Sequence, residues 1–562
     1  MHVDFIEYTP IKKEIAGAEE AESKTVRKED LVVLFTAVET GDEEDVARKA
    51  IREAKEFLEA LKVKRLMIYP FAHLSQNLAR PSQALPVLLE MDREAKALKI
   101  ETSRSPFGWT KALQVKVKGH PLAEMSRSYS QGERAAVQAP KPAADKRELS
   151  EHEMLARIRR SDFGSLPQTD HRILGEKLDL FSFQEPSPGM VYWHSKGLAL
   201  RDLLLEFIRK EQKKRNYIEI STPALANTIL WRVSGHWDHY KKDMFFTQLG
   251  NEQFGLKPMN CPSTFLYYKS KKWSYKDLPL RVADFDILYR NELSGVASGL
   301  FRLKSFTQDD AHIFVTEDQI ESELKGVIEL MAHFYEIFKL RYIPKISTMP
   351  DDHLGSEEQW DKAVKMLVDS VKAKGLEPVI RDKEGAFYGP KIDVDVKDSM
   401  GREWQCATIQ LDFQMPERFK LTYTGADGQE HTPAVIHRVI YGSIERFIGI
   451  LLEHYNGKLP VWISPVQARV IPLSDEYRKY AQEILSRMQM AGIRAEGDFE
   501  SGTMGGKIRN AQLQKIPYSI VIGKKEKESN TLAVRTREGE QKFGVDFTKF
   551  IIEVKQKEEI FE

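Results

Sequence analysis

Apolar and polar residues along the first 128 residues follow two different periods, one typical of strands and the other typical of helices. Continuous apolar runs at 31–35 and 66–69 predict two buried strands. The residues between them predict a helix that buries one apolar face against a sheet, because their apolar positions keep helical spacing. These positions are Val46, Ala50, Ile51, Ala54, Phe57, Leu58 and Leu61. We therefore expect a compact α/β unit in this part of the chain.

The middle part of the chain, residues 165–463, has a pattern that predicts a sheet of many strands. It opens with a helix, indicated by the spacing of Leu198, Leu204, Leu205 and Ile208. Strand-like runs follow at 217–220, 279–290, 302–315, 391–396, 404–413 and 433–440. A largely antiparallel sheet flanked by helices is the simplest architecture that uses all of these runs.

The last part of the chain alternates strand and helix patterns. A strand at 468–472, a helix at 475–490 and a strand at 518–523 follow one another, which is the signature of a small α/β domain. Apolar content falls sharply after Arg127, so a linker is predicted there. The fold class is therefore multidomain α/β and α+β, with a first unit at 1–128, a linker at 129–164, a middle unit at 165–463 and a last unit at 464–562.

Composition narrows the class of protein. A chain of 562 residues is too long for one core, so several domains are expected. Lysine plus arginine equals aspartate plus glutamate at 84 each, and such neutrality still allows a local basic face for nucleic acid. Two cysteines cannot form a disulfide framework, which fits a reducing cytosol. Neither a long apolar run nor a signal peptide is visible, so we expect a cytoplasmic protein that binds no membrane.

The stretch 286–312 predicts two strands joined by a loop of small residues, with charged residues at its base. Arg290 and Glu292 follow the first strand, and Arg302 precedes the second. Arginine recognises phosphate in a planar, bidentate manner, and an ionised glutamate only accepts hydrogen bonds, as a purine amine requires. A nucleoside triphosphate would suit this hairpin. The alternative is a surface hairpin with scattered charges.

Three potential metal ligands are spread over the middle part. Cys261 lies in the loop GLKPMNCP, His312 ends the hairpin stretch, and His437 lies in an apolar run. One thiolate and two imidazoles bind zinc and leave a fourth position open for a ligand. Their spacing is long-range, unlike that of compact zinc modules, so a buried cysteine and two hydrogen-bonded histidines remain an alternative.

Residues 441–455 predict a helix with an apolar stripe. Ser443 is placed to cap its start, and Gly442 permits a close backbone approach. Arg446 falls in the first turn, where its partner is either a phosphate or a neighbouring carboxylate.

Eight motifs occur in order through the middle part: YIEISTPAL from Tyr217, SGHWDHY from Ser234, KPMNCP from Lys257, RNELSG from Arg290, FTQDDAHIF from Phe306, EGAFYGPKID from Glu384, WQCATIQLDF from Trp404 and HRVIYGSIERF from His437. Together they resemble the catalytic domain of class II aminoacyl-tRNA synthetases, specifically of the threonyl-tRNA synthetase family. The resemblance implies the antiparallel class II sheet and an activity that uses ATP, with Mg²⁺, to charge tRNA(Thr) with L-threonine.

The resemblance also implies roles for individual residues. Arg290 would hold the α-phosphate of ATP, Glu292 the adenine amine, and Arg302 and Arg446 the outer phosphates. Pro223 matches the motif that forms a homodimer.

The amino-acid side of the site is implied in the same way. Cys261, His312 and His437 match the ligands of one zinc ion per subunit. His236 matches a residue tied to the transfer step, and Gln405 is assigned to both threonine and nucleotide. Residues implied around bound threonine are Met259, Gln308, Asp310, Tyr388 and Gln410.

Zinc explains how such a site selects threonine. The vicinal amino and hydroxyl groups of threonine can both bind an open zinc position, whereas valine has no hydroxyl. A site that demands a hydroxyl rejects the analogue without it by a factor on the order of 10⁴ or more. Serine keeps both groups and lacks only a methyl, worth about 1–3 kcal/mol. A second, hydrolytic site is therefore needed.

The first part of the chain contains IYPFAHLS at 68–75 and RSPFGWTKALQVKVKGHPLAE at 104–124. These segments resemble the N-terminal editing domain of archaeal threonyl-tRNA synthetases, itself similar to D-aminoacyl-tRNA deacylases. The resemblance implies a site that hydrolyses seryl-tRNA(Thr), built from Ala72, His73, Lys111 and Glu124. Lys111 would position a water and the terminal ribose. For His73, a core histidine is the alternative.

This chain departs from the family pattern in several places. Thr110 stands where a tyrosine is common, and Ser263-Thr264 replace Gly-His after the zinc cysteine. The family also has an apolar strand before the pattern that here begins at His2. Either the true start lies upstream, or the sheet lacks its first strand, which would expose backbone groups and apolar surface.

The last part resembles the anticodon-binding domain shared by the threonyl, prolyl, histidyl and glycyl enzymes. Its most specific piece is the run 531–537, which makes Arg535 the expected anticodon contact. Lys507 and Arg509 would contact phosphates, or are solvated surface cations. Phe499-Glu500-Ser501 replace a family Arg-Asn-Glu, so the asparagine that the resemblance implies for one base contact has no counterpart here.

Two alternatives compete with an active synthetase that edits in cis. A non-enzymatic tRNA-binding or regulatory paralogue usually lacks an ATP arginine or a zinc ligand, and this chain keeps all of them. A prolyl or seryl synthetase conflicts with the joint presence of Cys261, His312 and His437.

Overall fold

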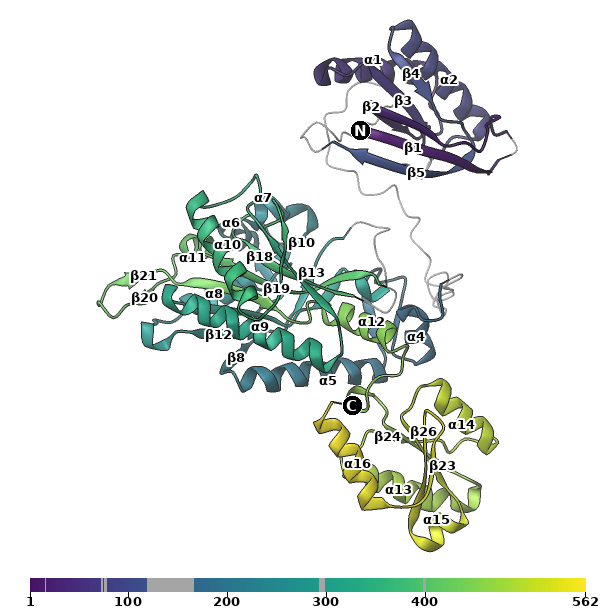
Figure 1. The fold of residues 1–562 in the computed structure, drawn as a ribbon, viewed down its shortest axis with the longest axis vertical. Helices are drawn as coiled ribbons and strands as arrows, with labels where there is room; N and C mark the ends of the chain where they lie inside the picture. The colour runs from purple at the N-terminus through teal and green to yellow at the C-terminus, as the bar shows by residue number, and fades with distance from the viewer. Residues whose placement is uncertain are drawn as a thin grey trace. The chain divides into compact units, whose positions relative to one another are not determined.

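The computed structural model describes residues 1–15, 17–71, 74, 78–118, 166–292, 299–397 and 401–561, without the side chain of His239. It divides into two compact units, Met1–Arg147 and Glu148–Glu562, each of which is described by itself (Figure 1). The predicted linker at 129–164 lies outside the described residues.

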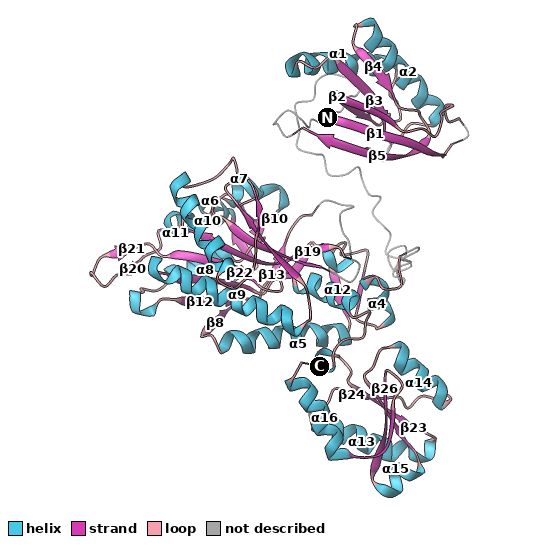
Figure 2. Ribbon diagram, in the orientation of Figure 1, coloured by secondary structure: helices cyan, strands magenta, loops and turns pink. Residues whose placement is uncertain are grey.

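The first unit is a five-stranded sheet in the order β4-β3-β2-β1-β5 with two helices against one face (Figure 2). The predicted strands at 31–35 and 66–69 and the helix between them are confirmed. The elements are β1 (His2–Lys13), β2 (Val26–Thr36), α1 (Glu44–Leu61), β3 (Arg65–Pro70), α2 (Pro81–Ala97), β4 (Glu101–Arg104) and β5 (Trp109–Val117).

Of the two alternatives for the start of the chain, the structure contradicts the one in which the sheet lacks its first strand. Residues 2–13 themselves form β1, which pairs antiparallel with β2 on one side and with β5 on the other. Ile6 lies opposite Lys28 and Val115, and its side chain is fully buried. The amino group of Met1 donates to the Val33 carbonyl at 2.8 Å. The backbone of β1 is thus paired along both edges, and its alternating apolar residues bury one face of the strand.

The second unit contains an eight-stranded sheet in the order β17-β16-β18-β19-β22-β15-β12-β8. Only the β16/β17 and β12/β8 pairs are parallel, so the predicted antiparallel architecture is confirmed. Its strands are β8 (Tyr217–Ile220), β12 (Leu280–Asp284), β15 (Asp310–Val315), β16 (Tyr342–Ser347), β17 (Val379–Arg381), β18 (Lys391–Lys397), β19 (Glu403–Asp412) and β22 (Ala434–Val439).

Helices cover both faces of this sheet, each over an apolar core. One face packs against α5 (Ser195–Lys213), α9 (Ile320–Ile337), α10 (Glu357–Lys372) and α12 (Ile444–His454). The other face packs against α8 (Cys261–Lys269), α6 (Thr228–Val233) and α11 (Gln414–Arg418). Smaller elements complete the core: α4 (His171–Lys177), β6 (Phe181–Phe183), β7 (Val191–Trp193), β9 (Leu225–Asn227), α7 (His236–Tyr240), β10 (Phe246–Leu249), β11 (Glu252–Leu256), β20 (Tyr423–Thr424) and β21 (Glu430–His431).

The predicted hairpin strands at 279–290 and 302–315 are each broken in two. β12 and β15 pair inside the large sheet, whereas β13 (Ile287–Tyr289) and β14 (Ser305–Thr307) form a separate two-stranded sheet. The first break lies at Asp284 to Asp286, where the Asp286 N–H donates to Asp284 Oδ1 at 3.0 Å. The hairpin therefore contributes to two sheets. Most of its small-residue loop, residues 293–298, lies outside the described residues.

The C-terminal part has a five-stranded sheet in the order β24-β23-β25-β26-β27. The predicted alternation of strand and helix is confirmed, and β23 pairs in parallel with β24 and β25. The elements are β23 (Ala468–Pro472), α13 (Arg478–Met490), β24 (Ala495–Gly497), α14 (Met504–Leu513), β25 (Tyr518–Ile522), α15 (Lys524–Ser529), β26 (Thr531–Thr536), β27 (Gln541–Asp546) and α16 (Phe547–Glu559).

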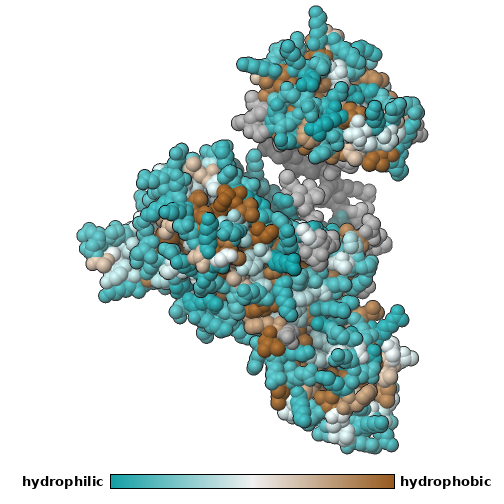
Figure 3. Space-filling view, in the orientation of Figure 1, coloured by the Kyte–Doolittle hydropathy of each residue, from teal (hydrophilic) through white to brown (hydrophobic). Residues whose placement is uncertain are grey.

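Polar residues dominate the face of the molecule drawn in Figure 3, with apolar residues gathered in patches. Exposed apolar side chains include Ile218 on β8, Ile229 and Val233 on α6, and Leu249 on β10. Among the described residues, no helix is both long and apolar enough to cross a membrane.

Candidate active site

Two neighbouring strands and the start of a helix bring Cys261, His312 and His437 together. His312 on β15 lies directly opposite His437 on β22, so both imidazoles project from the same face of the sheet. Cys261 opens α8, which packs on that face. One potential ligand atom from each of the three lies within 4.8 Å of the others.

The chemistry of this cluster fits a zinc ion. His437 Nε2 lies 3.0 Å from Asp412 Oδ2, which assigns its proton to Nε2 and leaves Nδ1 with a lone pair. His312 Nδ1 is buried and has no hydrogen-bond partner among the described residues. Burial lowers the pKa of His312, which keeps this imidazole neutral. Burial also raises the pKa of the Cys261 thiol, so a cation beside it would be needed to favour the thiolate that zinc binds.

Polar side chains predicted to contact threonine line the surroundings of this cluster. The Tyr388 hydroxyl donates to Gln410 Oε1 at 2.9 Å, and the Tyr388 ring lies 5.6 Å from the His437 ring. Asp310 is buried two residues before His312, and burial raises the pKa of its carboxyl. Gln308 forms an isolated bridge with Ser443 at the start of α12.

His236 lies fully buried beside the same face. Its Nδ1 is 2.8 Å from Ser234 Oγ, and its Nε2 is 3.0 Å from the sulfur of Met259. The structure thus brings two predicted residues, His236 and Met259, into direct contact, and Met259 lies two residues before Cys261 in the chain.

The predicted ATP arginines converge from separate elements. Arg446 donates from Nε to the Phe301 carbonyl and from Nη1 to the Gln405 carbonyl, both at 2.9 Å. Burial lowers the pKa of Arg446, and the positive charges of Arg290 and Arg302 lower it further. Three arginines close enough to repel one another indicate an anion-binding site.

The carboxylate predicted to accept the adenine amine has an arginine partner. Glu292 Oε2 accepts from Arg302 Nε at 2.9 Å. Arg290 lies with its guanidinium 5.0 Å from the Phe306 ring and 5.7 Å from the Tyr240 ring. These aromatic faces orient a planar cation towards the site.

A network that the sequence does not reveal holds the peptide just before Arg302. The Leu300 N–H donates to His171 Nε2 at 3.0 Å, and His171 Nδ1 lies 2.7 Å from Glu453 Oε1. Arg402 donates to the other oxygen of Glu453. Asp170, His171 and Glu453 form a buried group that could hold a metal ion, but their ligand atoms are engaged in hydrogen bonds. This group therefore supports the peptide at Leu300 and is a poor metal site.

The turn before α12 is as predicted. Ser443 Oγ accepts from the Arg446 N–H at 3.2 Å and caps the helix. Gly442 has a φ of 75°, and a Cβ there would lie 2.5 Å from the Cys406 carbonyl oxygen. Only glycine therefore fits this position without displacing β19.

In the first unit, Lys111 is the described member of the predicted editing site. Its ammonium donates to the Pro106 carbonyl at 2.7 Å and lies 4.7 Å from the centre of the Tyr69 ring. Burial lowers the pKa of Lys111 to about 8, with a further contribution from the charge of Arg104. Ala72, His73 and Glu124 lie outside the described residues.

The structure adds an ion pair to this site. Arg104 binds Glu19 through both terminal nitrogens, each at 2.5 Å. Glu19 opposes the effect of Arg104 on the Lys111 pKa. Thr110, which replaces the family tyrosine, donates to Glu14 at 2.9 Å. No sequence signal connects Glu19 with Arg104, because they are far apart in the chain.

In the C-terminal part, Arg535 lies on β26 opposite Ser519 and Gln541. Its Nε is buried without a hydrogen-bond partner among the described residues. Lys507 instead donates to the Asp498 carbonyl at 3.1 Å, so it stabilises the domain locally. Arg509 is exposed.

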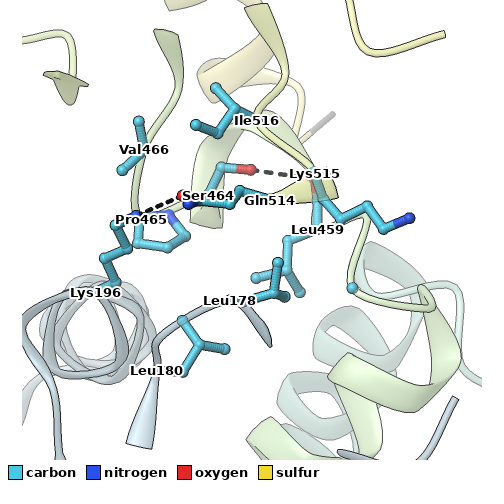
Figure 4. Close-up of a pocket in the computed structure, with 11 residues that line it drawn as sticks. Leu178, Leu180, Lys196, Leu459, Ser464, Pro465, Val466, Gln514, Lys515 and Ile516 are labelled. Carbon is cyan, nitrogen blue, oxygen red and sulfur yellow. Dashed lines mark hydrogen bonds between the residues drawn. The ribbon is translucent and has the colours of Figure 1, made fainter. Parts of the chain in front are cut away.

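One pocket lies away from these residues, where residues 165–463 meet the C-terminal part of the chain (Figure 4). Lys196 Nζ donates to Gln514 Oε1 at 2.9 Å across this junction. None of its lining residues is a predicted site residue: Leu178, Leu180, Lys196, Gly457, Leu459, Ser464, Pro465, Val466, Gln514, Lys515 and Ile516.

Known domain families match successive parts of the chain. The tRNA synthetase class II core domain (G, H, P, S and T) matches residues 243–455, and the anticodon binding domain matches residues 467–557. With the antiparallel sheet and its arginines, these matches define a class II aminoacyl-tRNA synthetase. Residues 1–129 match the archaea-specific editing domain of threonyl-tRNA synthetase. The chain belongs to the threonyl-tRNA synthetase family, with an editing domain of the archaeal type.

Individual relatives agree with this family. The chain is 52% identical over 368 residues to the threonine–tRNA ligase of Acetivibrio thermocellus, covering 66% of this chain and 58% of that protein. It is 51% identical over 368 residues to that of Caldanaerobacter subterraneus, covering 66% and 57%. The chain thus spans less than two thirds of the length of these relatives. The crystal structure of the RNA binding domain of threonyl-tRNA synthetase from Cryptosporidium parvum is 39% identical, with a TM-score of 0.67, covering 69% of this chain and 98% of that one.

Proposed function

We propose that this protein activates L-threonine with ATP, transfers it to tRNA(Thr), and hydrolyses seryl-tRNA(Thr) in its N-terminal unit. The observation that carries this proposal is the convergence of Cys261, His312 and His437 beside the arginines that surround Arg446. The functional units proposed are residues 1–128 for editing, 165–463 for catalysis and 464–562 for anticodon binding.

Cys261, His312 and His437 would hold one zinc ion per subunit. When bound, zinc supplies a coordination position that takes the amino and hydroxyl groups of threonine together. Asp310 and the Tyr388–Gln410 pair would orient these two groups by hydrogen bonding. The buried Asp412 carboxylate keeps His437 in the tautomer that binds metal.

ATP, with Mg²⁺, would bind on the side of Gln308 that faces away from the zinc ligands. Arg290 would take the α-phosphate, Arg302 and Arg446 the outer phosphates, and Glu292 and Gln405 the rest of the nucleotide. Guanidinium groups held in place by Phe301 and Phe306 stabilise the charge that develops as the threonine carboxylate attacks the α-phosphorus. Nucleotide binding would replace the Glu292–Arg302 pair with contacts to adenine and phosphate. His236, beside Met259, would act in the transfer step.

Editing would rest on Lys111, with His73 shaping a pocket that accepts serine. Burial penalises the charged form of Lys111 and lowers its pKa to about 8, so the ammonium that would bind the ribose or orient a water is present only below that pH. Arg535 would contact the anticodon. A homodimer would form around Pro223 and the neighbouring edge strand β8, which exposes Ile218.

Pyrophosphate exchange tests the first half of this proposal. Purified protein with zinc, ATP and threonine is expected to exchange labelled pyrophosphate into ATP. A complete lack of threonine-dependent exchange, with tRNA binding retained, would instead support a non-enzymatic paralogue.

A further inference from the structure

Asp309 lies between two predicted threonine contacts, Gln308 and Asp310, yet its side chain points to the opposite side of the site. It is fully buried. Its carboxylate accepts from three successive backbone N–H groups, those of Ile440 at 2.8 Å, Tyr441 at 3.0 Å and Gly442 at 3.0 Å. A side chain from one strand end therefore binds the whole turn that follows β22.

The main chain of Asp309 is held as well. The Asp309 carbonyl accepts from Arg438 Nη1 at 2.9 Å, and the same nitrogen lies 3.9 Å from Asp309 Oδ2. Arg438 is fully buried and lies 4.6 Å from the Tyr217 ring. Because Arg438 follows His437 in β22, one continuous segment joins a zinc-site histidine to the turn that Asp309 binds.

This turn determines where Arg446 lies. Gly442 is confined between the Asp309 carboxylate and the Cys406 carbonyl, since a Cβ at Gly442 would lie 2.5 Å from that oxygen. Ser443 follows at once and caps α12, and Arg446 falls in the first turn of that helix. A shift of the turn would therefore move Arg446 away from Phe301 and Gln405.

The three N–H groups all need an acceptor, which an ionised carboxylate supplies with both oxygens. Burial raises the pKa of Asp309 to about 7, while Arg438 and the N–H groups of Ile440 and Tyr441 oppose that rise. Asparagine at this position would turn one acceptor into an N–H donor that faces other donors. The geometry thus requires the carboxylate and tolerates no isosteric amide.

We propose that Asp309 is a positioning residue that couples the threonine-binding strand end to the ATP-binding Arg446, an inference that rests on the proposed function. Its backbone neighbours would contact the amino acid, while its carboxylate fixes the arginine for the outer phosphates. A carboxylate that merely stabilised the fold would affect both substrates equally.

The test compares Asp309→Asn, Gly442→Ala and Glu211→Gln in the full-length protein. Gly442→Ala disturbs the same turn from the side of Cys406 and leaves Asp309 intact. Glu211→Gln is the matched control, because Glu211 is also a buried carboxylate of this unit, and among the described residues its ion pairs are with Lys214, Arg215 and His333. Binding of a non-hydrolysable ATP analogue by calorimetry is the first measurement, and KM and kcat in pyrophosphate exchange are the second.

For both turn variants we expect ATP-analogue affinity to fall, and KM for ATP to rise, by about tenfold or more, with KM for threonine changed by less than about twofold. Glu211→Gln should leave all three values unchanged. Equal changes in both KM values, or a loss of kcat alone in proportion to unfolded protein, would overturn the inference. Wild-type protein that binds the analogue but does not exchange pyrophosphate would refute the proposed function while the binding results still decide the role of Asp309. Wild-type protein that does not bind the analogue would refute both.

Discussion

At the scale of single residues, Asp412 illustrates how a side chain outside the ligand set controls the candidate zinc site. It orients His437 through Nε2 and also accepts two backbone N–H groups at the start of α11. We predict that Asp412→Asn weakens zinc affinity by about 10–100-fold, because the imidazole loses its anionic partner. Competition with a zinc-binding dye measures this change.

Asp427→Asn is the matched control for that experiment. Asp427 also lies against a histidine, His431, at 2.9 Å, but this pair is exposed and away from the cluster. Equal zinc affinity in the wild type and in Asp412→Asn would show that Asp412 does not support the site.

Lys111 allows a second prediction at this scale. Lys111→Ala should let seryl-tRNA(Thr) accumulate while threonine-dependent exchange stays unchanged, since Lys111 belongs to the other compact unit. Lys116→Ala, on the same strand but largely exposed, is the control that should clear seryl-tRNA normally. Thin-layer analysis of the charged tRNA gives the measurement, and normal clearance by Lys111→Ala would contradict the editing assignment.

The pH dependence of editing follows from the lowered pKa of Lys111. Its ammonium is present below about pH 8 and is lost as pH rises through that value, well before an unperturbed lysine titrates. If the charged form positions the substrate, deacylation above the Lys111→Ala background falls as pH rises past about 8. A rate that rises through this range would point to the neutral amine instead.

Sequence patterns predict the roles of some of these residues and not of others. Ser443 and Gly442 could be placed from local rules, because a cap and a close approach depend on neighbours in the chain. Asp309 could not, since its partners at 440–442 come from another strand. The Arg104–Glu19 pair was missed for the same reason. Convergence of the zinc-site residues became predictable only through the family resemblance.

At the scale of elements, hydrophobic periodicity predicted several helices and strands correctly, including α1, β18 and β22. It failed at the hairpin, where the apolar runs at 279–290 and 302–315 each predict one continuous strand. The break depends on distant polar groups: Asp286 Oδ2 accepts from the Thr222 N–H at 2.5 Å and from Lys257 at 2.7 Å. Such contacts are tertiary, so no local pattern records them.

Strand β1 allows a stability prediction at this scale. Ile6 is fully buried between β2 and β5, and Ile6→Ala should destabilise the first unit by about 2–5 kcal/mol. Ile11, on the same strand, is 59% exposed, so Ile11→Ala should cost little. Hydrogen exchange of the β1 peptide measures the destabilisation that each substitution causes. Equal protection in the two variants would mean that burial of Ile6 in β1 does not stabilise the sheet.

At the scale of the whole molecule, the proposed function joins a synthetic unit that would not fully exclude serine with a hydrolytic unit that would remove it. Selection against valine depends on the hydroxyl of threonine, and selection against serine depends on one methyl group. The first discrimination is large and the second is about 1–3 kcal/mol, so only serine needs editing. A chain that contains both units could therefore reject valine during synthesis and serine by hydrolysis.

Selection of threonine through its hydroxyl can be measured by amino-acid-dependent pyrophosphate exchange, run side by side with threonine, serine and valine at fixed zinc and ATP. We predict strong exchange with threonine, exchange with serine reduced by about 10–200-fold, and exchange with valine lower by a factor on the order of 10⁴ or more. Exchange with valine comparable to that with threonine, or none with threonine, would contradict this prediction.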